Sequence, residues 1–524
     1  MEGGSLSFRP AITPLRLWTA GLLLAGVTLV LTLYRDYGIT WDEPVQARYG
    51  EAVLAYFRAG FQGPGRLPDV DLRHYGPAFE LLAAVAYSGS PEAKYEIRHL
   101  LLGLTALLGV LAVIRVANRL GGLFTAVAAS LVLVLLPSFT GHAFNNSKDI
   151  PFAALFAWAV LALVRFTAEP GRWRHALACG IALGAALAVR PGGLPILFGL
   201  FALAAGLSTL SGVNLRALAL RGMAAWALAW AVLVAPWPWA HQDPLRHPLE
   251  AVATAFKFPV RFPVLFEGEV VMSDALPRRY LAETLVLTTP PTVLALALVG
   301  LAAALVAQRR APLAPEARLL AVIEAWLFAP VLLSLVVRPN VYDGMRHVLF
   351  VLPALALLAG HGAAALLAWA PPGWSRRSAA ALLLAVCVLP LHAMLRLHPY
   401  QMTYFNALAG GLARAGSRYE TDYWLSSYKE AIEWVNRRAA ERGDEPVRIL
   451  VAIDGYAWDC AAHYLAPGVE MQALPRVQPG GAIPEPFDYF VATTRYAAHL
   501  GFSASPVIHE IGRDGATFTV IRAR

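Results

Sequence analysis

The ionisable residues of this sequence gather in a few short groups, and several of these groups combine an acid with a cation or place two acids together. Asp42 and Glu43 are adjacent, Lys148 directly precedes Asp149, and an Arg-His pair occupies positions 346 and 347. A carboxylate can take a proton from an attacking nucleophile, and nearby cations can stabilise an anion that develops during a reaction. These residue types and spacings therefore predict base chemistry beside an anionic group.

The segments that carry these groups are apolar and long enough to span a membrane. Of the 524 residues, 57% are apolar and 15% are charged, whereas about a quarter of the residues of a soluble domain are charged. This composition excludes a disordered chain and a nucleic-acid-binding module, and it predicts a polytopic α-helical membrane protein. Eleven apolar runs are candidate spans: Leu17–Tyr34, Leu100–Ala117, Gly121–Pro137, Ile150–Val164, Ala176–Val189, Leu194–Leu210, Gly222–Trp239, Leu285–Ala307, Leu319–Val337, Val348–Trp369 and Ser378–Leu395.

The charges of the loops predict the orientation of these spans. With the N-terminus inside, the inner segments carry 14 Arg against three acids, while the outer segment 35–96 carries nine acids against six bases. Positive charge accumulates in cytoplasmic loops of membrane proteins. We therefore expect a protein of the inner (plasma) membrane with a cytoplasmic N-terminus and, because eleven is odd, an extracytoplasmic, periplasmic C-terminal part.

Two domains are expected from this pattern. Residues 1–395 form the transmembrane domain, whose outer loop 35–98 contains interfacial helices at Pro44–Phe57 and Pro77–Ser88, and whose outer loop 241–283 mixes aromatic and basic residues. Residues 396–524 form a small α/β domain outside the membrane. Its expected elements are a helix and four strands, the last two joined by a hairpin at Gly512–Gly515: Tyr428–Ala440, Val447–Ile453, Phe487–Thr493, Val507–Ile511 and Ala516–Ile521.

The ionisable groups lie at the outer ends of the expected spans. Asp42 and Glu43 follow the first span, Arg98 opens the second, and Lys148-Asp149 precedes the fourth. Arg190 ends the fifth span, and Asp343, Arg346 and His347 lie between the ninth and the tenth. Charged groups are costly in lipid and often mark function. Their convergence on one side predicts a site at the outer interface, where several cations could bind an anionic lipid headgroup.

Several motifs resemble the GT-C glycosyltransferases, in particular the dolichyl-phosphate-mannose–protein mannosyltransferase-like branch. This branch includes bacterial phospholipid carrier-dependent glycosyltransferases and the lipid A aminoarabinose transferases. The resemblance covers roughly residues 15 to 435 and begins with the acidic motif that follows the first span. The segments that carry it are Tyr37–Glu43, His74–Phe79, Ser147–Phe152, Tyr342–His347, Tyr404–Gly411 and Tyr419–Trp424.

The resemblance implies an inverting transfer of a hexose or pentose from a polyprenyl-phosphate donor to a lipid, glycan or protein acceptor through a hydroxyl, amine or phosphate group. It implies that Asp42 is the base, that Glu43 orients it or binds the acceptor, and that Asp149 positions the acceptor or a cation. A lipid phosphate is a good leaving group, so one carboxylate suffices. The candidates for binding the carrier phosphate are Lys148, Arg190, Arg98, Arg346 and His347.

No cofactor is assigned from the sequence. A divalent cation is possible, because Asp42, Glu43 and Asp149 offer oxygen ligands and the first outer loop contains Asp69-Val70-Asp71. Two other classes of function stay open, a membrane transporter and a non-catalytic scaffold with an outer domain. A transporter would show inverted repeats and polar groups at mid-membrane. A non-catalytic scaffold would give no functional role to the groups that combine acids and cations.

Overall fold

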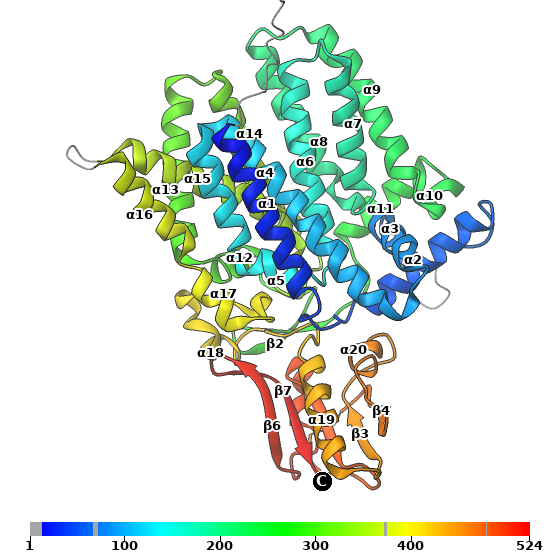
Figure 1. Cartoon of the computed structure of the whole chain (residues 1–524). Coiled ribbons are helices and arrows are strands. Elements are labelled where there is room, and N and C mark those ends of the chain that lie inside the picture. The colour runs from blue at the N-terminus through cyan, green and yellow to red at the C-terminus, as the bar shows by residue number, and fades with distance from the viewer. Residues whose placement is uncertain (1–12, 66–71, 371–374, 478) are drawn as a thin grey trace, which may run out of the picture.

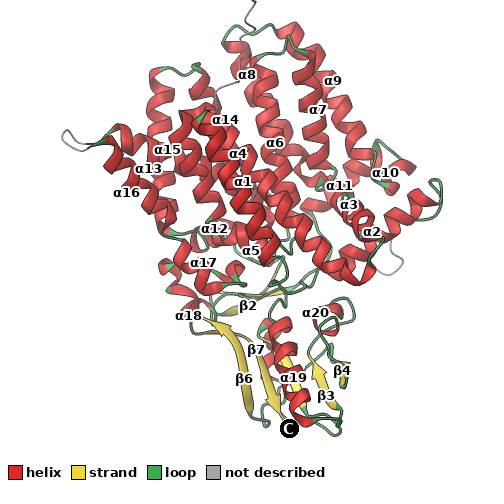
Figure 2. Cartoon of the chain, in the orientation of Figure 1, coloured by secondary structure: helices red, strands yellow, loops and turns green. Residues whose placement is uncertain are grey.

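The computed structural model describes residues 13–65, 72–370, 375–477 and 479–524. Long helices form one bundle, and a small sheet domain lies at one end of it, at the bottom of Figures 1 and 2. The longer helices are α1 (Pro14–Leu33), α4 (Lys94–Val134), α6 (Asp149–Ala168), α7 (Trp173–Leu187), α8 (Leu194–Leu210), α9 (Leu215–Val234), α13 (Pro291–Arg310), α14 (Pro315–Val337), α15 (Leu352–Ala368) and α16 (Arg376–Val388).

Within the described residues, nine helices are long and apolar enough to cross a membrane. The predicted multi-pass helical class is confirmed, but the predicted number of eleven spans is not. One reason is that the segment Pro91–Val134 is a single run of 44 residues that contains one expected span and most of a second. The other is that α7 has only 15 residues, fewer than the roughly 20 that a bilayer core requires.

A sharp break divides α4 where the sequence places a loop between two spans. Gly121 and Gly122 have non-helical backbone angles, and Gly122 lies at φ 74° and ψ −158°. A straight helix of 41 residues would be about 60 Å long, twice the apolar thickness of a bilayer. Both halves instead lie beside α1, because Gly103 approaches Val30 while Trp18 Nε1 donates to Ser130 Oγ at 3.1 Å. The chain therefore reverses at the two glycines.

Short elements join the long helices on the side of the sheet domain. Both helices expected in loop 35–98 are present, as α2 (Glu43–Arg58) and α3 (Ala78–Tyr87). The loop 241–283, which the sequence places at the outer face, contains a hairpin of β1 (Pro263–Phe266) and β2 (Glu269–Met272) that the sequence did not predict. The other short helices are α5 (Pro137–His142), α10 (Pro238–Gln242), α11 (Arg246–Phe256), α12 (Tyr280–Leu287), α17 (Leu391–Leu397), α18 (Gly411–Ala415) and the 3₁₀ turns η1 (Pro91–Ala93), η2 (Pro191–Gly193), η3 (Arg346–Val351), η4 (Gln401–Thr403), η5 (Ala407–Ala409) and η6 (Arg495–Leu500).

The C-terminal part contains a five-stranded mixed sheet with the order β4-β3-β5-β7-β6. Strand β3 pairs in parallel with β4 and β5, whereas β7 pairs antiparallel with β5 and β6. The predicted α/β class is confirmed, including the hairpin at Gly512–Gly515, and the sequence missed β4 and the short helix α20. The elements are α19 (Tyr428–Arg442), β3 (Val447–Val451), α20 (Asp459–Ala462), β4 (Val469–Ala473), β5 (Tyr489–Thr493), β6 (Val507–Arg513) and β7 (Ala516–Ala523).

The loop between α1 and α2 joins the helix bundle to the C-terminal part. Trp41 N donates to Trp424 O at 2.9 Å, and Ile39 N donates to the Tyr464 hydroxyl at 3.0 Å. A Cβ atom on Gly38 would lie 2.1 Å from Ser426 O, so only glycine permits this approach. The loop that carries Asp42 is therefore held by both parts of the chain.

Candidate active site

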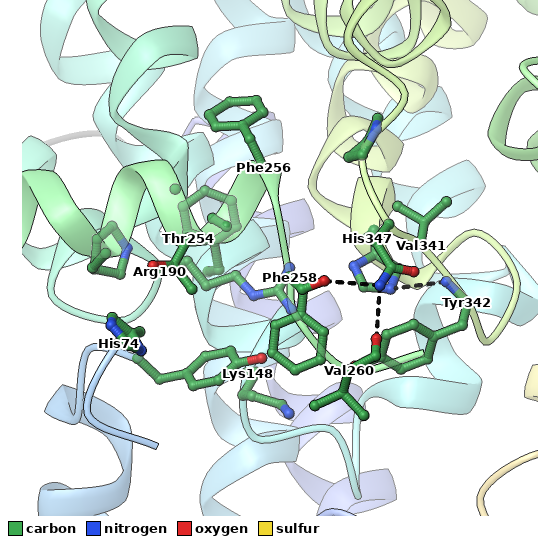
Figure 3. A pocket seen from close by; sticks show the side chains of 18 of the residues that line it. His74, Lys148, Arg190, Thr254, Phe256, Phe258, Val260, Val341, Tyr342 and His347 are labelled. Carbon is green, nitrogen blue, oxygen red and sulfur yellow. Dashed lines mark hydrogen bonds between the residues drawn. The ribbon is translucent and has the colours of Figure 1, made fainter. Parts of the chain in front are cut away.

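A cavity of about 650 Å³ lies between the helix bundle and the sheet domain. Four of the residues predicted for the site line it: Asp42, Lys148, Arg190 and His347. The C-terminal part contributes Asp454 and Tyr456 to its wall. Much of the remaining wall is apolar and comes from α8, α11, η3, the loop after α11 and the end of α14, as Figure 3 shows for Phe256, Phe258 and Val260.

Asp42 lies at the polar end of this cavity and faces two cations. Its Oδ2 atom lies 2.8 Å from Lys148 Nζ and 3.6 Å from Arg346 Nη1. Burial raises the pKa of this carboxyl, but the charges of Lys148 and Arg346 outweigh burial and hold the pKa at about 2. Asp42 is therefore ionised at neutral pH, and 28% of its side chain stays exposed.

Asp149 is buried behind the cavity wall and holds two cations in place. Its Oδ1 lies 2.8 Å from Arg190 Nη2, and its Oδ2 lies 3.9 Å from Arg346 Nη1. The Asn146 amide donates to Oδ2 at 2.9 Å, and the Asp149 backbone N donates to Asn146 Oδ1 at 2.9 Å, which fixes the first turn of α6. Asp149 therefore contacts the cations of the site but not the cavity itself.

Arg346 occupies the centre of an alternating chain of charges. In addition to Asp42 and Asp149 it binds Asp343, whose Oδ2 lies 3.0 Å from Arg346 Nη2. Its guanidinium group lies over the Trp424 ring at 5.1 Å, and only 2% of its side chain is exposed. Asp343 in turn accepts a hydrogen bond at 2.8 Å from Arg495, at the start of η6. Charges from the helix bundle and the sheet domain thus form one network.

The sequence placed Asp343 among the ionisable groups at the outer ends of the spans but gave it no role, and it gave no indication of Arg495. Asp343 lies within the segment Tyr342–His347 that carries the resemblance, so its position gave a signal. Arg495 follows a buried strand in a part of the chain that matched no known motif, and no local pattern distinguishes it from the other arginines. Only the docking of the sheet domain brings it to the site.

Glu43 and Arg98 lie outside this network, in a separate buried cluster. Glu43 Oε2 accepts from Thr40 N at 2.9 Å, and Oε1 lies 3.1 Å from His99 Nε2. Arg98 Nη1 lies 2.7 Å from Glu80 Oε2, and its Nε lies 4.0 Å from Glu43 Oε1. Neither Glu43 nor Arg98 lines the cavity, and both are almost completely buried. Their contacts tie α2 and α3 to α4.

His347 lines the cavity next to the aromatic ring of Tyr342, as Figure 3 shows. Its Nε2 atom accepts a hydrogen bond from Tyr342 N at 3.4 Å. Because Nε2 accepts, the proton of the neutral ring is on Nδ1. The ring can therefore offer a single donor to a group in the cavity.

Oxygen and nitrogen ligands for a metal ion are not grouped in the part of the chain that the structure describes. No set of three or more His, Cys, Asp or Glu side chains within those residues could hold a metal ion. Asp42 and Asp149 face arginine and lysine instead. Asp69 and Asp71, which the sequence offered as a possible metal site, lie outside the described residues.

Comparison with solved structures identifies the fold. ArnT from Cupriavidus metallidurans, solved bound to undecaprenyl phosphate, is similar over 96% of this chain and 98% of its own, with a TM-score of 0.50 and 17% sequence identity. The chain has the fold of ArnT. The GT-C-like fold expected from the sequence is thereby confirmed.

Two other solved proteins are similar over most of this chain. The oligosaccharyltransferase of Archaeoglobus fulgidus has 13% identity, a TM-score of 0.48 and coverage of 92% of this chain and 71% of its own. The arabinofuranosyltransferase AftD from Mycobacteria has 17% identity, a TM-score of 0.43 and coverage of 100% and 42%. No protein-family model matches the chain, and no curated protein matches it by sequence.

Proposed function

We propose that this protein transfers a sugar from a polyprenyl-phosphate donor to an acceptor nucleophile at the extracytoplasmic face of the plasma membrane. The observation that carries the proposal is the composition of the cavity, in which Asp42, Lys148 and Arg190 lie at one end and an apolar wall extends from them. A polyprenyl-phosphate sugar has the same division, with a charged headgroup on an apolar tail. The fold shared with ArnT, which was solved bound to undecaprenyl phosphate, supports this choice of donor.

Lys148 and Arg190 bind the carrier phosphate in this proposal. Both line the cavity, and their side chains are 11% and 17% exposed, so a ligand can reach them. The donor phosphodiester carries one negative charge and gains a second as the sugar leaves. Cations fixed at this place stabilise the transition state more than the ground state. His347 adds a hydrogen bond from Nδ1.

Asp42 is the base that takes the proton from the acceptor as it attacks the anomeric carbon. Its ion pairs with Lys148 and Arg346 both use Oδ2, so Oδ1 can face the acceptor. A carboxylate with a pKa of about 2 is a weak base, but a phosphate that binds Lys148 shares the charge of this lysine. The bound donor therefore raises the pKa of Asp42 and makes it a better base for the transfer.

Asp149 and Arg346 act as positioning residues. Asp149 holds Arg190 and Arg346, and Arg346 holds Asp42, so these groups fix the geometry from behind the wall. Glu43 and Arg98 stabilise the packing of α2 and α3 on α4 without contact to the donor. The attack of the acceptor from the side opposite the phosphate gives inversion at the anomeric carbon, and no covalent intermediate is required.

The test is an assay of sugar transfer by Asp42→Asn in reconstituted vesicles. The substrates are undecaprenyl-phosphate pentoses and hexoses with radiolabelled sugars, together with the membrane fraction as the source of acceptors. An amide keeps the shape of the carboxyl but cannot accept a proton at neutral pH, so we expect transfer to be abolished while the carrier lipid still binds.

The matched control is Asp36→Asn, because Asp36 lies in the same loop, pairs with His398 and does not line the cavity. This variant should transfer sugar at the wild-type rate. Full activity of Asp42→Asn would remove Asp42 from the mechanism, and failure of the wild type to use any of the donors would overturn the proposed function.

A further inference from the structure

A second cavity, of about 750 Å³, lies at the opposite end of α6 from the candidate active site. Asp149 begins α6 and Arg165 lies in its last turn, so the two ends are roughly 24 Å apart at 1.5 Å per residue. Basic side chains dominate the wall, and they come from α4, α6, α7, α14 and the loop before α7: Arg119, Arg165, Arg172, Arg174, His175 and Arg318.

The positive charge of this basic cavity is almost unopposed. Glu169 is the single acid among its lining residues, and it pairs with Arg172 at 2.7 Å. Arg119, Arg165, Arg174 and Arg318 form no ion pair with a carboxylate in the described part of the chain. Like charges gathered in a partly enclosed space repel one another, so an anion inside the cavity would stabilise this arrangement.

Buried donor atoms in the wall also lack partners. The Nε atoms of Arg165 and Arg318 and the Nδ1 atom of His175 are buried, and no group of the described residues accepts or donates a hydrogen bond there. Buried polar atoms are normally hydrogen-bonded. Arg318 is held in place from the other side, because its Nη1 donates to Ser211 Oγ at 2.7 Å. The guanidinium groups of Arg165 and Arg318 therefore keep N–H donors, and His175 keeps a ring nitrogen, that no described protein group uses.

Two arginines at this end of the bundle, Arg115 and Arg221, lie outside the basic cavity and have protein groups as partners. Arg115 lies over the Trp158 ring at 4.9 Å, and Arg221 Nη1 donates to Pro170 O at 2.6 Å. The charge bias of cytoplasmic loops requires only that arginines be near the membrane. It does not require that residues from three separate helices, Arg119, Arg165 and Arg318, converge on one cavity.

We propose that the basic cavity is a binding site for a phosphate group. Arginine side chains present a planar set of donors that matches phosphate oxygens, and basic pockets between transmembrane helices bind the headgroups of anionic lipids. The same chemistry suits a phospholipid headgroup and a free phosphate. The site is independent of the proposed sugar transfer, because it lies at the other end of the helices.

The experiment measures binding of two probes to the purified, delipidated full-length protein. Native mass spectrometry with dioleoylphosphatidylglycerol tests the lipid headgroup, with dioleoylphosphatidylcholine as the neutral control lipid. Competition by inorganic phosphate tests the free anion. We expect the anionic lipid to bind more tightly than the neutral one, and displacement by inorganic phosphate would identify the free anion as an equally suitable ligand.

Variants locate the bound anion. Arg165→Gln with Arg318→Gln should weaken binding at least tenfold, whereas Arg115→Gln, at the same end but outside the cavity, should not change it. If the first pair fails to fold, Arg119→Gln with Arg174→Gln offers a second pair, because both of these side chains are exposed; we expect a loss of at least threefold. Lys148→Ala should bind normally, which separates this site from the proposed donor site.

Equal binding of the anionic and neutral lipids, with no effect of inorganic phosphate, would overturn the proposal. Unchanged affinity in a folded cavity variant would do the same. A loss of affinity in Arg115→Gln as large as that in the cavity pair would show general charge attraction at the membrane surface. A loss of affinity confined to Lys148→Ala would place the anion in the first cavity. Both of these results contradict a site at the basic cavity.

Discussion

Lys148 and Arg190 reach the same cavity but are paired with different acids. Lys148 contacts Asp42, the proposed base, whereas Arg190 contacts the buried Asp149. Loss of Lys148 therefore changes the pKa of the base as well as the positive charge available to the phosphate. Loss of Arg190 changes the second of these more than the first.

We predict that Lys148→Ala and Arg190→Ala each lower turnover about ten- to a hundredfold, since a charge-assisted contact is worth about 1.5–3 kcal/mol. Lys148→Ala should also raise the pKa of Asp42, because burial remains while its largest opposing charge is lost. Activity that needs the carboxylate is lost as the pH falls through this pKa, so the acid limb of the rate profile should move to higher pH.

The pH profile of the transfer rate is the measurement for both variants. Lys94→Ala is the matched control, because Lys94 contacts Glu51 and does not line the cavity. Normal turnover in Lys148→Ala or Arg190→Ala would mean that the residue is an interfacial anchor only.

Glu420 provides a prediction about stability. Burial raises the pKa of its carboxyl, Arg495 lowers it and Asp343 raises it again, and the pKa reaches about 7 against an ordinary value of 4.5. Between these two values the folded protein keeps a proton that the unfolded chain releases. The stability that this group contributes is therefore present below pH about 4.5 and is lost as the pH rises through about 7.

We expect the melting temperature of the wild type to fall by a few degrees more across this pH window than that of Glu420→Gln. Differential scanning fluorimetry in detergent at a series of pH values measures the melting temperatures of both proteins. Parallel curves for the two proteins would show that Glu420 titrates at its ordinary pKa.

Asp42 and Glu43 show what the sequence could and could not predict at this scale. Both belong to the acidic motif, and the sequence predicted that the motif carries chemistry. Adjacent residues at the start of a helix point about 100° apart, so one faces the cavity and the other faces His99 and Arg98. Which of the two side chains faces the cavity depends on how α2 is rotated about its axis against its neighbours. The local sequence does not determine that rotation.

At the scale of elements, the reversal of the chain direction at Gly121 and Gly122 gives the most direct prediction. Gly122 has backbone angles that are essentially restricted to glycine, and it connects two halves that both pack beside α1. Gly122→Ala should destabilise the protein by about 1–3 kcal/mol, which we expect as a lower melting temperature and a lower yield in membranes.

Gly199→Ala is the matched control for this substitution. Gly199 lies inside α8, and a Cβ atom there would meet no other group within 4 Å. Alanine favours a helix over glycine by up to about 1 kcal/mol, so this variant should be as stable as the wild type or more stable. Equal stability of Gly122→Ala would mean that the two halves of α4 do not depend on this backbone conformation.

Prediction from sequence was most accurate for elements with a strong physical requirement. A chain in lipid must satisfy its backbone groups internally, so long apolar runs form helices, and the hairpin at Gly512–Gly515 was also predicted correctly. Strands β1 and β2 have four residues each and β4 has five, too few to give a strong strand pattern, and β4 pairs with β3, which lies about 20 residues earlier in the chain. The boundary between the domains at residue 395 stays a prediction, because α17 spans that position.

At the scale of the whole molecule, Arg495 connects the sheet domain to the proposed catalytic charges. It donates to Asp343 and to Tyr423 O, and it lies over the Trp41 ring. We predict that Arg495→Gln lowers kcat severalfold with little change in the KM for the donor, because it loosens the positions of Asp343 and Arg346 without removing a phosphate contact. Arg495→Lys should recover part of the loss.

The control for general docking of the domain is Arg513→Gln. Arg513 connects β6 to Glu430 and to His398 O, away from the cavity, so kcat should be unchanged. Steady-state kinetics in vesicles measures both parameters. Equal losses of kcat in the two variants would show that Arg495 acts only by holding the domain in place.

The connection through Arg495 also has a consequence for biosynthesis. The ribosome makes Asp42 early and Arg495 roughly 450 residues later, which at about 5–20 residues per second is a delay of roughly 20 to 90 s. Throughout that interval the helices can enter the bilayer while the Asp343–Arg346 pair still lacks its outer cation. The charge network that the proposed function uses is therefore complete only after the last part of the chain has been made, and a nascent or truncated chain lacks its Arg495.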